Sequence, residues 1–331
     1  MADEEARWIT ESEVVDLVSL REAIAALERG LKEEHAGQAV NMNKTHAAWN
    51  RKRSTLHAIG AVLEGMGIAG TKTWVHTPAG ACPLLILFNS ENGRLMAVIE
   101  AFALGQMRTA GISGVATRAL AHEKADEMAI VGTGRQALAQ VAGVHAVRPL
   151  KRLRVYSPNP EHRKVFVDKV RSQFSFDVTA TNSVQQAVEG VPIVTLVTRA
   201  TEPFLSSAML ASDCHVNAVG AITPQRQEFA QDVLERSTRI VVDNLDSVRR
   251  LSREFIEQFG DDDNKWRVVQ PLSAVVAAGG GRPPGADMTL FKAMGMGLSD
   301  LALAQTILDR TYSRGAGREI PQPKKQPLRF F

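Results

Sequence analysis

From Met128 onward, short apolar runs alternate with helical segments, and this alternation limits the possible folds more than any other feature of the chain. Two parallel strands need a crossover connection, which is usually a helix. Right-handed crossovers place such helices on both faces of one parallel sheet. The sequence therefore predicts an α/β fold with a doubly wound, Rossmann-type parallel sheet. The expected strands are 128–131, 153–156, 176–179, 193–197, 215–219 and 239–242, and the expected helices are 135–147, 160–173, 184–188 and 226–234.

The turn after the first of these strands carries a glycine pattern that is typical of dinucleotide-binding proteins. Gly132 and Gly134 stand at the first two glycines of G-x-G-x-x-G/A, and Ala137 stands at the third. The first glycine allows a tight turn, the second lets the backbone approach the pyrophosphate, and the small third residue lets the helix pack closely on the strand. Unpaired N–H groups at the helix start would bind the pyrophosphate, with Arg135 and Gln136 beside it. An ordinary glycine turn is the alternative, but the strand before it and the helix after it favour NAD(P) binding.

The choice between NAD and NADP depends on the residues that follow the second strand. NAD-binding proteins usually carry an acidic residue about 20 positions after the glycines, where it binds the ribose 2′-hydroxyl. Here Ser157 and Asn159 follow the strand, and Arg163 lies just beyond them. Hydroxyl and amide groups beside a cation suit a 2′-phosphate, so the sequence favours NADP over NAD as the cofactor. The alternative is that Arg163 is a solvated helix residue.

The residues before the alternating segment follow a different pattern. Apolar residues at helical spacing predict an amphipathic helix over 19–37. Four later runs are rich in strand-forming residues, and Asn92-Gly93 between the last two is a hairpin signal. These runs predict a mostly antiparallel sheet. Its expected strands are 54–61, 70–76, 84–89 and 94–100, and the remaining expected elements are a helix over 101–123, a loop over 279–285, a helix over 289–314 and an extended arm over 315–331.

Charge and composition argue against several classes of protein. The net charge is +3 and the basic residues are spread along the chain, which does not favour binding to nucleic acid. No run reaches the roughly 18 apolar residues of a membrane span. The start shows no secretory pattern, and the only two cysteines, Cys82 and Cys214, have no short spacing between them, which excludes a disulfide framework and a cysteine-rich zinc site. We therefore expect a cytoplasmic protein that binds no membrane and, because no His/Asp/Glu cluster has ligand spacing, no metal.

Five segments taken together resemble the ornithine cyclodeaminase/mu-crystallin family. The resemblance spans residues 10–315 in the family's order. It implies a Rossmann domain over 121–299, inserted in an α+β substrate-binding and dimerisation domain formed by residues 1–120 and 300–331. It also implies a homodimer. The segments are Gly70-Thr-Lys-Thr-Trp74, Met107-Arg-Thr-Ala-Gly-Ile-Ser113, Ile130-Val-Gly-Thr-Gly-Arg-Gln-Ala137, Val216-Asn-Ala-Val-Gly-Ala-Ile-Thr-Pro224 with Gln227-Glu228, and Thr289-Leu-Phe-Lys-Ala-Met-Gly-Met-Gly-Leu-Ser-Asp300.

The same resemblance implies an activity. Members of the family reduce imines of 2-oxo acids, dehydrogenate amino acids or cyclise ornithine. Lys72 falls at the family's active-site lysine, and Arg108 falls at its carboxylate-binding arginine. An arginine fork binds a carboxylate bidentately, and a lysine beside an imine can donate a proton as hydride arrives. The alternatives are a solvated strand lysine and a helix-surface ion pair.

Other site residues follow from the resemblance less directly. The family's Pro-x-Arg, a further carboxylate contact, is absent, and Lys44 or His46 would substitute for it. His57 and His76 are further candidates, although a lone histidine is more often structural. Asp300 would cap or orient the last long helix. The positions that the resemblance places near the cofactor are Thr109, Thr117, Thr198, Val219, Met294 and Gly295, and threonines packed inside the helix are the alternative for the first two.

One departure from the family bears on the substrate. Ornithine cyclodeaminases carry an aspartate two residues after the position of Gly220, where this chain has Ile222. An isoleucine cannot bind a distal ammonium group, so the sequence favours an NAD(P)H-dependent imine reductase or amino-acid dehydrogenase acting on a small carboxylate substrate. The alternatives are a cyclodeaminase, which Ile222 disfavours, and an NADP-dependent binding protein similar to mu-crystallin.

Overall fold

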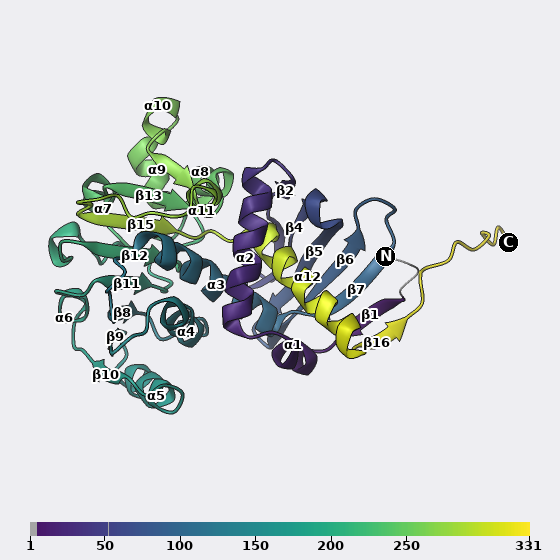
Figure 1. Cartoon of the computed structure of the whole chain (residues 1–331), viewed down its shortest axis with the longest axis horizontal. Helices are drawn as coiled ribbons and strands as arrows, with labels where there is room; N and C mark the ends of the chain where they lie inside the picture. Colours follow the sequence, from purple (N-terminus) through teal and green to yellow (C-terminus); the bar gives the residue numbers. More distant parts are fainter. Residues whose placement is uncertain (1–4, 52) are drawn as a thin grey trace. The chain divides into compact units, whose positions relative to one another are not determined.

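The computed structural model describes residues 5–51 and 53–331, which divide into two compact units (Figure 1). The first unit contains the residues up to Ser19, Ala36–Gly105 and Met296–Phe331, and the second contains Leu20–His35 and Gln106–Gly295. The bounds expected from the sequence place residues 1–120 in one domain. In the structure, the helix Leu20–His35 groups with the second unit because it packs there on α4 (Ala137–Val147) and α11 (Leu272–Ala277). In the described part of the chain, no helix has both the length and the apolar character to cross a bilayer.

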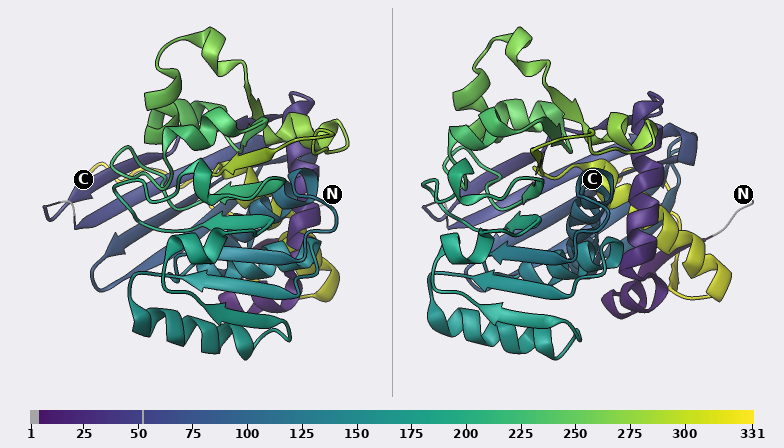
Figure 2. Two further views of the ribbon diagram at one scale, coloured as in Figure 1. Left: turned by 90° about the vertical axis from the view of Figure 1, so that its left-hand side faces the viewer. Right: turned by 60° about the vertical axis from the view of Figure 1, so that its left-hand side comes forward.

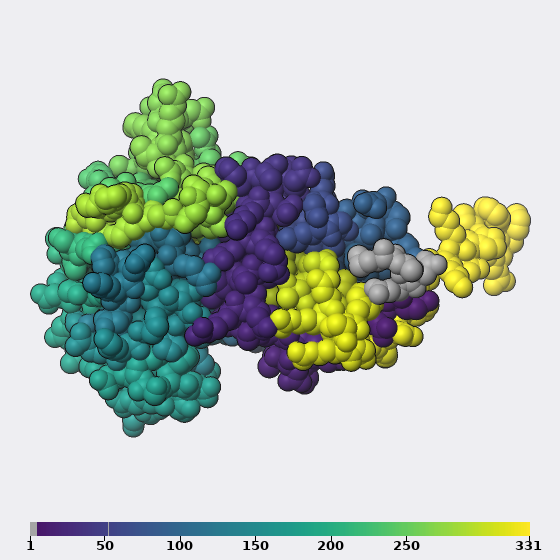
Figure 3. Space-filling view, in the orientation of Figure 1, coloured from purple at the N-terminus to yellow at the C-terminus, as the bar shows by residue number. Residues whose placement is uncertain are grey.

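Among the described residues, the first unit forms an eight-stranded, mostly antiparallel sheet in the order β16-β1-β7-β6-β5-β4-β2, with β3 paired to β4. The four strands and the hairpin expected before residue 100 are confirmed. The arm after β16 has no regular structure and is exposed (Figures 1 and 3). The elements of this unit are β1 (Ala6–Ile9), α1 (Glu11–Leu17), β2 (Ala39–Asn41), β3 (Thr45–Trp49), β4 (Ser54–Leu63), η1 (Glu64–Met66), β5 (Ile68–Thr77), β6 (Gly80–Asn89), β7 (Leu95–Glu100), α12 (Gly297–Arg314) and β16 (Arg318–Ile320).

Helix α12 packs on one face of this sheet, and glycines set how closely it approaches (Figures 1 and 2). A Cβ on Gly297, the first residue of α12, would lie 2.0 Å from the carbonyl oxygen of Gly60 on β4. A Cβ on Gly60 would in turn lie 2.4 Å from the carbonyl oxygen of Gly70 on β5. Since no real Cβ tolerates such distances, these positions require glycine, and the start of α12 rests directly on the strands.

The second unit is a doubly wound parallel sheet in the order β10-β9-β8-β11-β12-β15-β13-β14. Met128 and Ile130 pack with α4 and α5 on one face, whereas Ala129 and Val131 pack with α6, α7 and α9 on the other. The fold class expected from the sequence is therefore confirmed. The elements are α2 (Leu20–His35), α3 (Phe102–Leu120, which begins in the first unit), β8 (Glu127–Val131), α4 (Ala137–Val147), β9 (Arg152–Tyr156), α5 (Pro160–Arg171), β10 (Asp177–Ala180), α6 (Val184–Val188), β11 (Ile193–Leu196), η2 (Ser207–Met209), β12 (Cys214–Ala218), α7 (Gln231–Arg236), β13 (Arg239–Val242), α8 (Leu245–Leu251), α9 (Arg253–Phe259), α10 (Asp263–Trp266), β14 (Val269–Pro271), α11 (Leu272–Ala277) and β15 (Met288–Lys292).

Two helices expected from the sequence begin later in the structure. Residues 289–292 belong to β15, a fully buried strand between β12 and β13, and helix α12 begins only at Gly297. A strand that is buried on both faces is mostly apolar, and a short, mostly apolar run does not distinguish a strand from a helix. Residues 226–230 form a loop before α7, and Glu228 in that loop accepts hydrogen bonds from two other loops.

A buried polar network connects strands of the second unit to α3. His215 Nδ1 lies 2.9 Å from Thr289 Oγ1, and His215 Nε2 lies 3.1 Å from Asn217 Oδ1. Asn217 Nδ2 donates a hydrogen bond to Thr117 Oγ1 over 3.0 Å. Thr117 is fully buried and thus packs on its neighbours, the alternative considered for it from the sequence.

We expect this network to make folding stability sensitive to acid. Burial lowers the pKa of His215 to about 3, whereas an unfolded histidine titrates near about 6.5. Below that pH the unfolded chain binds a proton that the folded chain does not bind. This histidine therefore lowers the free energy of unfolding by up to about 1.4 kcal/mol per pH unit between about pH 6.5 and 3. The free energy of unfolding, measured with urea at several pH values, should depend less steeply on pH in His215→Gln than in wild type. The exposed His162→Gln should show the same dependence on pH as wild type. An unchanged slope in His215→Gln would contradict this account.

Candidate functional site

The turn between β8 and α4 has the geometry that a dinucleotide site needs. Gly132 has a φ of +110°, and a Cβ there would lie 2.6 Å from a carbonyl oxygen of the loop after β11. A Cβ on Gly134 would meet nothing within 4 Å, so the space in front of this exposed residue is open. Ala137 is fully buried at the start of α4, Arg135 is exposed beside the turn, and Gln136 Oε1 is buried without a hydrogen-bond partner. These residues fit NAD(P), with the two glycines and the N–H groups at the start of α4 holding the pyrophosphate.

The loop after β9 holds Arg163 in a defined place. Arg163 Nη1 donates to the carbonyl oxygen of Ser157 over 2.8 Å, and its guanidinium carbon lies 5.6 Å from the centroid of the Tyr156 ring. Asn159 caps α5, because its Oδ1 accepts hydrogen bonds from two backbone N–H groups in the first turn of that helix. Arg163 is therefore fixed at the carboxyl end of β9, where the ribose of the adenosine half binds in Rossmann proteins.

The loops after β11 and β12 are joined by a buried carboxylate. Glu228 Oε1 accepts hydrogen bonds from the backbone N–H and the hydroxyl of Thr198 over 2.6 and 2.8 Å. Glu228 Oε2 accepts hydrogen bonds from the N–H groups of Gly220 and Ala221 over 2.8 and 3.0 Å. Burial raises the pKa of Glu228, and the nearby ammonium of Lys292 opposes that shift. The hydroxyl of Thr198 is thus bound to a carboxylate of the protein.

A second buried carboxylate organises the loop after β15. Asp243, directly after β13, accepts hydrogen bonds from the N–H groups of Met294 and Gly295 over 2.9 and 2.7 Å. Burial raises the pKa of Asp243, and these two hydrogen bonds and the positive charge of Arg108 oppose the shift. Gly295 has a φ of +84°. The carboxylate therefore keeps two N–H groups of this turn facing the protein.

Arg108 lies against that turn. A Cβ on Gly295 would lie 3.1 Å from Arg108 Nη1, so the guanidinium packs on the glycine backbone. Arg108 is half-buried on α3, and the carbonyl of its neighbour Thr109 accepts a hydrogen bond from Gln140 Nε2 over 3.1 Å. Val219, the residue after β12, belongs to the same carboxyl end of the sheet. The structure thus brings Arg108 together with Met294 and Gly295 at the edge where α/β proteins bind ligands.

In the first unit, Lys72 is a buried lysine. It lies on β5, is 4% exposed, and its ammonium forms an ion pair with Asp300, which is fully buried in the first turn of α12. Lys72 Nζ also lies 5.5 Å from the centroid of the Trp74 ring. The alternative of a solvated strand lysine is therefore excluded.

Aromatic rings extend from Trp74 toward the edge of the same sheet face. The His57 ring is stacked on the Trp74 ring at 4.7 Å, and the His46 ring on the His57 ring at 5.7 Å. Lys44 Nζ lies 5.8 Å from the centroid of the Trp74 ring. Burial, and after it the charge of Lys44, lowers the pKa of His57 to about 4, so His57 is neutral at pH 7. The structure thus groups Lys44 and His46 with Lys72.

Several of these features were not expected from the sequence. Glu228 and Asp243 were not named as site residues, although Asp243 follows a parallel strand at its carboxyl end, where ligand sites form. The sequence indicates Trp74 only as part of the motif Gly70–Trp74 and assigns it no role of its own. Ile222 is half-buried and packs against the core of the second unit.

Within residues 5–51 and 53–331, no group of three or more His, Cys, Asp and Glu side chains is arranged to hold a metal ion.

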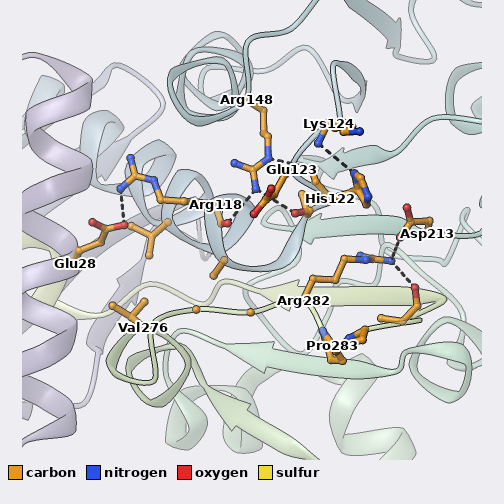
Figure 4. A pocket seen from close by; sticks show the side chains of 18 of the residues that line it. Glu28, Arg118, His122, Glu123, Lys124, Arg148, Asp213, Val276, Arg282 and Pro283 are labelled. Atoms are coloured by element: carbon orange, nitrogen blue, oxygen red, sulfur yellow. Dashed lines mark hydrogen bonds and ion pairs between the residues drawn. The ribbon is translucent and has the colours of Figure 1, made fainter.

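The second unit also contains a cavity of 810 Å³ at the amino ends of its strands (Figure 4). It is lined by α2, the end of α3 and the glycine-rich loop 279–285. Arg148 donates hydrogen bonds to the carbonyl oxygens of Arg118 and His122. Arg282 donates a hydrogen bond to the carbonyl oxygen of Ala286 and forms an ion pair with Asp213 over 2.8 Å. Both guanidiniums therefore have partners within the protein. The cavity lies at the opposite end of the strands from the glycine turn.

Known proteins share both the sequence pattern and the fold. The model of the ornithine cyclodeaminase/mu-crystallin family matches residues 5–315. A Delta(1)-pyrroline-2-carboxylate reductase of Bacillus cereus (strain ATCC 10987 / NRS 248) is 26% identical over 94% of this chain and 98% of its own length. The ketimine reductase mu-crystallin of Mus musculus is 30% identical over 68% of each chain. The structure of an archaeal alanine dehydrogenase dimer with bound NAD has a TM-score of 0.86 at 24% identity, and the match covers 99% of this chain and 100% of that one. This chain therefore belongs to the ornithine cyclodeaminase/mu-crystallin family.

Proposed function

We propose that this chain catalyses the NAD(P)H-dependent reduction of an α-imino acid or cyclic ketimine, or the reverse dehydrogenation of the amino acid. The observation that carries the proposal is Lys72, a buried lysine paired with the fully buried Asp300. Such a buried pair costs desolvation energy and is poor evidence of a stability gain, so its presence favours a chemical role. The dinucleotide turn of the second unit, and the reductases and dehydrogenase among the relatives, support the same reaction.

Each residue of this proposal has a defined task. The guanidinium of Arg108, packed on Gly295, binds the carboxylate of the substrate through two parallel hydrogen bonds. Lys72 donates a proton to the imine nitrogen, and Asp300 keeps Lys72 charged and oriented. Bound NAD(P)H supplies the hydride that reaches the α-carbon. Lys44 contacts the polar part of the substrate, as does His46.

Two other functions in the family are less well supported. A cyclodeaminase needs a group that binds the distal ammonium of ornithine, and the position of the family's aspartate is occupied by Ile222, which packs on the core. A protein that only binds a ligand needs no buried proton donor, which Lys72 provides.

The cytoplasmic location expected from the sequence stays a prediction.

The test is the oxidation of NADPH and NADH, followed by nicotinamide absorbance. The substrates are 2-oxo acids with ammonia or methylamine, together with cyclic ketimine carboxylates. We expect turnover with at least one of them. Failure to bind either nucleotide would overturn the proposal. Tight nucleotide binding without turnover would favour a binding protein, and ammonia release from ornithine without net oxidation of NADPH would favour a cyclodeaminase.

We further propose NADPH as the preferred cofactor, because Arg163 is fixed at the end of β9 and residues 157–160 contain no carboxylate. Arg163→Ala should lower kcat/KM for NADPH about tenfold, the value of one charge-assisted contact, while kcat/KM for NADH changes little. The exposed neighbour Lys164 provides a matched control, Lys164→Ala, which should leave the ratio unchanged. An equal fall with both nucleotides in Arg163→Ala would show that Arg163 only holds the loop.

We propose that the chain forms a homodimer through the face of the first sheet opposite α12. Lys72 points to α12, so the strand alternation places Val75, its cross-strand partner Leu56, and Phe88 on the other face. These three apolar side chains are 39%, 44% and 37% exposed. Exposed apolar side chains on one face of a sheet are typical of a surface that binds a protein partner, and the archaeal relative is a dimer.

Introducing charge on this face should separate the protomers. In Leu56→Glu/Phe88→Glu, two carboxylates per protomer would be buried in the interface without partners, which is strongly unfavourable. Light scattering after size exclusion should report a dimer for wild type and a monomer for this variant. Val165→Glu, at a 65% exposed apolar position on α5, should remain dimeric. A monomeric wild-type protein, or a dimeric double variant, would contradict this interface.

A further inference from the structure

Glu228 is a buried glutamate, and both oxygens of its carboxylate accept hydrogen bonds from the protein. It is fully buried, and its two oxygens accept four hydrogen bonds, two from Thr198 and one each from Gly220 and Ala221. Three of the four donors are backbone N–H groups. The carboxylate therefore fixes the path of two loops that are far apart in the sequence, one after β11 and one after β12.

Neighbouring charges hold Glu228 in place. Its own N–H donates to Glu254 Oε1 over 3.2 Å, and Lys292 Nζ donates to both oxygens of Glu254 over 3.2 and 3.3 Å. Lys292 also lies 5.7 Å from the centroid of the Phe229 ring. Both charged neighbours are fully buried. Three buried ionisable residues, Glu228, Glu254 and Lys292, thus form one connected group beside the two loops. Burying such charges costs desolvation energy, which favours a functional role for the group.

The sheet order shows which part of the cofactor these loops would meet. The strands β10-β9-β8 form one half of the Rossmann unit and β11-β12-β15 form the other, and the order reverses between β8 and β11. In this fold one half binds the adenosine part of the dinucleotide and the other binds the nicotinamide part. Because β8 carries the glycine turn, the loops after β11 and β12 belong to the nicotinamide half.

We propose that Glu228 is a positioning residue for the nicotinamide half of the cofactor site. Its carboxylate holds the Thr198 loop and the Gly220–Ala221 loop together through hydrogen bonds to both. This inference rests on the proposed NAD(P)-dependent function. It predicts that loss of these hydrogen bonds weakens binding of the nicotinamide half and leaves binding of the adenosine half intact.

Glu228→Gln is the sharpest substitution for the test. An amide has one oxygen and one NH₂ group, and in either orientation the NH₂ would face at least one backbone N–H, which can only donate. The variant must therefore lose at least one of these backbone hydrogen bonds while it keeps its size. The matched control is Glu127→Gln. Glu127 is also buried and accepts hydrogen bonds from arginines, but it stands at the amino end of β8.

The experiment compares binding of NADH, NADPH and ADP-ribose to each protein by calorimetry, with NADH fluorescence as a second readout. For Glu228→Gln we expect binding of the full dinucleotides to weaken about tenfold or more, and binding of ADP-ribose to change less than about twofold. In saturated enzyme, hydrogen exchange should increase in residues 198–200 and 219–223. Glu127→Gln should bind all three ligands as wild type does.

The possible outcomes are distinct. If wild type binds none of the ligands, the proposed function itself fails. If wild type binds all three and Glu228→Gln binds them equally well, Glu228 is not a positioning residue. If Glu228→Gln loses ADP-ribose and NADH to the same extent, Glu228 serves the stability of the whole unit, and the inference is also overturned.

Discussion

Lys72→Met is expected to lower kcat/KM by about 10²- to 10⁴-fold, the range typical of losing a general acid. Methionine fills a similar volume on β5 but has no proton to donate to the imine nitrogen. The substitution has a second consequence, because the Lys72 ammonium is paired with Asp300 in a buried site. Removing one partner of a buried ion pair leaves an uncompensated charge and costs about 3–5 kcal/mol of stability.

The double variant Lys72→Met/Asp300→Asn separates these two effects. Because both charges are removed, we expect an unfolding temperature close to that of wild type, while activity stays as low as in Lys72→Met. Turnover is measured with the best substrate of the imine panel, and unfolding is followed by circular dichroism. Recovery of activity in the double variant would show that Lys72 only stabilises the fold.

Gly134→Val is expected to weaken NAD(P)H binding by at least about 100-fold, a loss of about 2.7 kcal/mol, with little change in stability. Gly134 is exposed, and a Cβ there meets no atom of the protein within 4 Å. The added side chain would instead occupy the space that the pyrophosphate needs at the start of α4. Calorimetric titration with NADPH measures the affinity.

Gly132→Ala provides the contrast, since its Cβ would collide with the Val197 carbonyl oxygen at 2.6 Å and φ is +110°. It should lose stability as well as cofactor binding, whereas Gly134→Val should lose binding alone. Unchanged NADPH affinity in Gly134→Val would place the pyrophosphate elsewhere.

The features that the sequence determined by itself are local ones. The alternation of strands and helices after Met128, the glycine pattern from Gly132 to Ala137 and the Asn92-Gly93 hairpin all appear in the structure as expected. Each depends on neighbours within a few residues: backbone conformations that glycine allows, the period of two in strands, and the period of 3.6 in helices. Such information is present in one sequence, so the doubly wound sheet could be predicted from it.

What only the tertiary structure decided depends on residues that are far apart in the chain. Asp300 meets Lys72 only because Gly297 lets α12 rest on β4. Residues 289–292 form a strand because β12 and β13 flank them, although their apolar run also suits a helix. The loop containing Glu228 is not helical because its carboxylate accepts N–H groups from the loops after β11 and β12. A buried charge is stable only beside its partners, and a single sequence does not show where those partners come to lie.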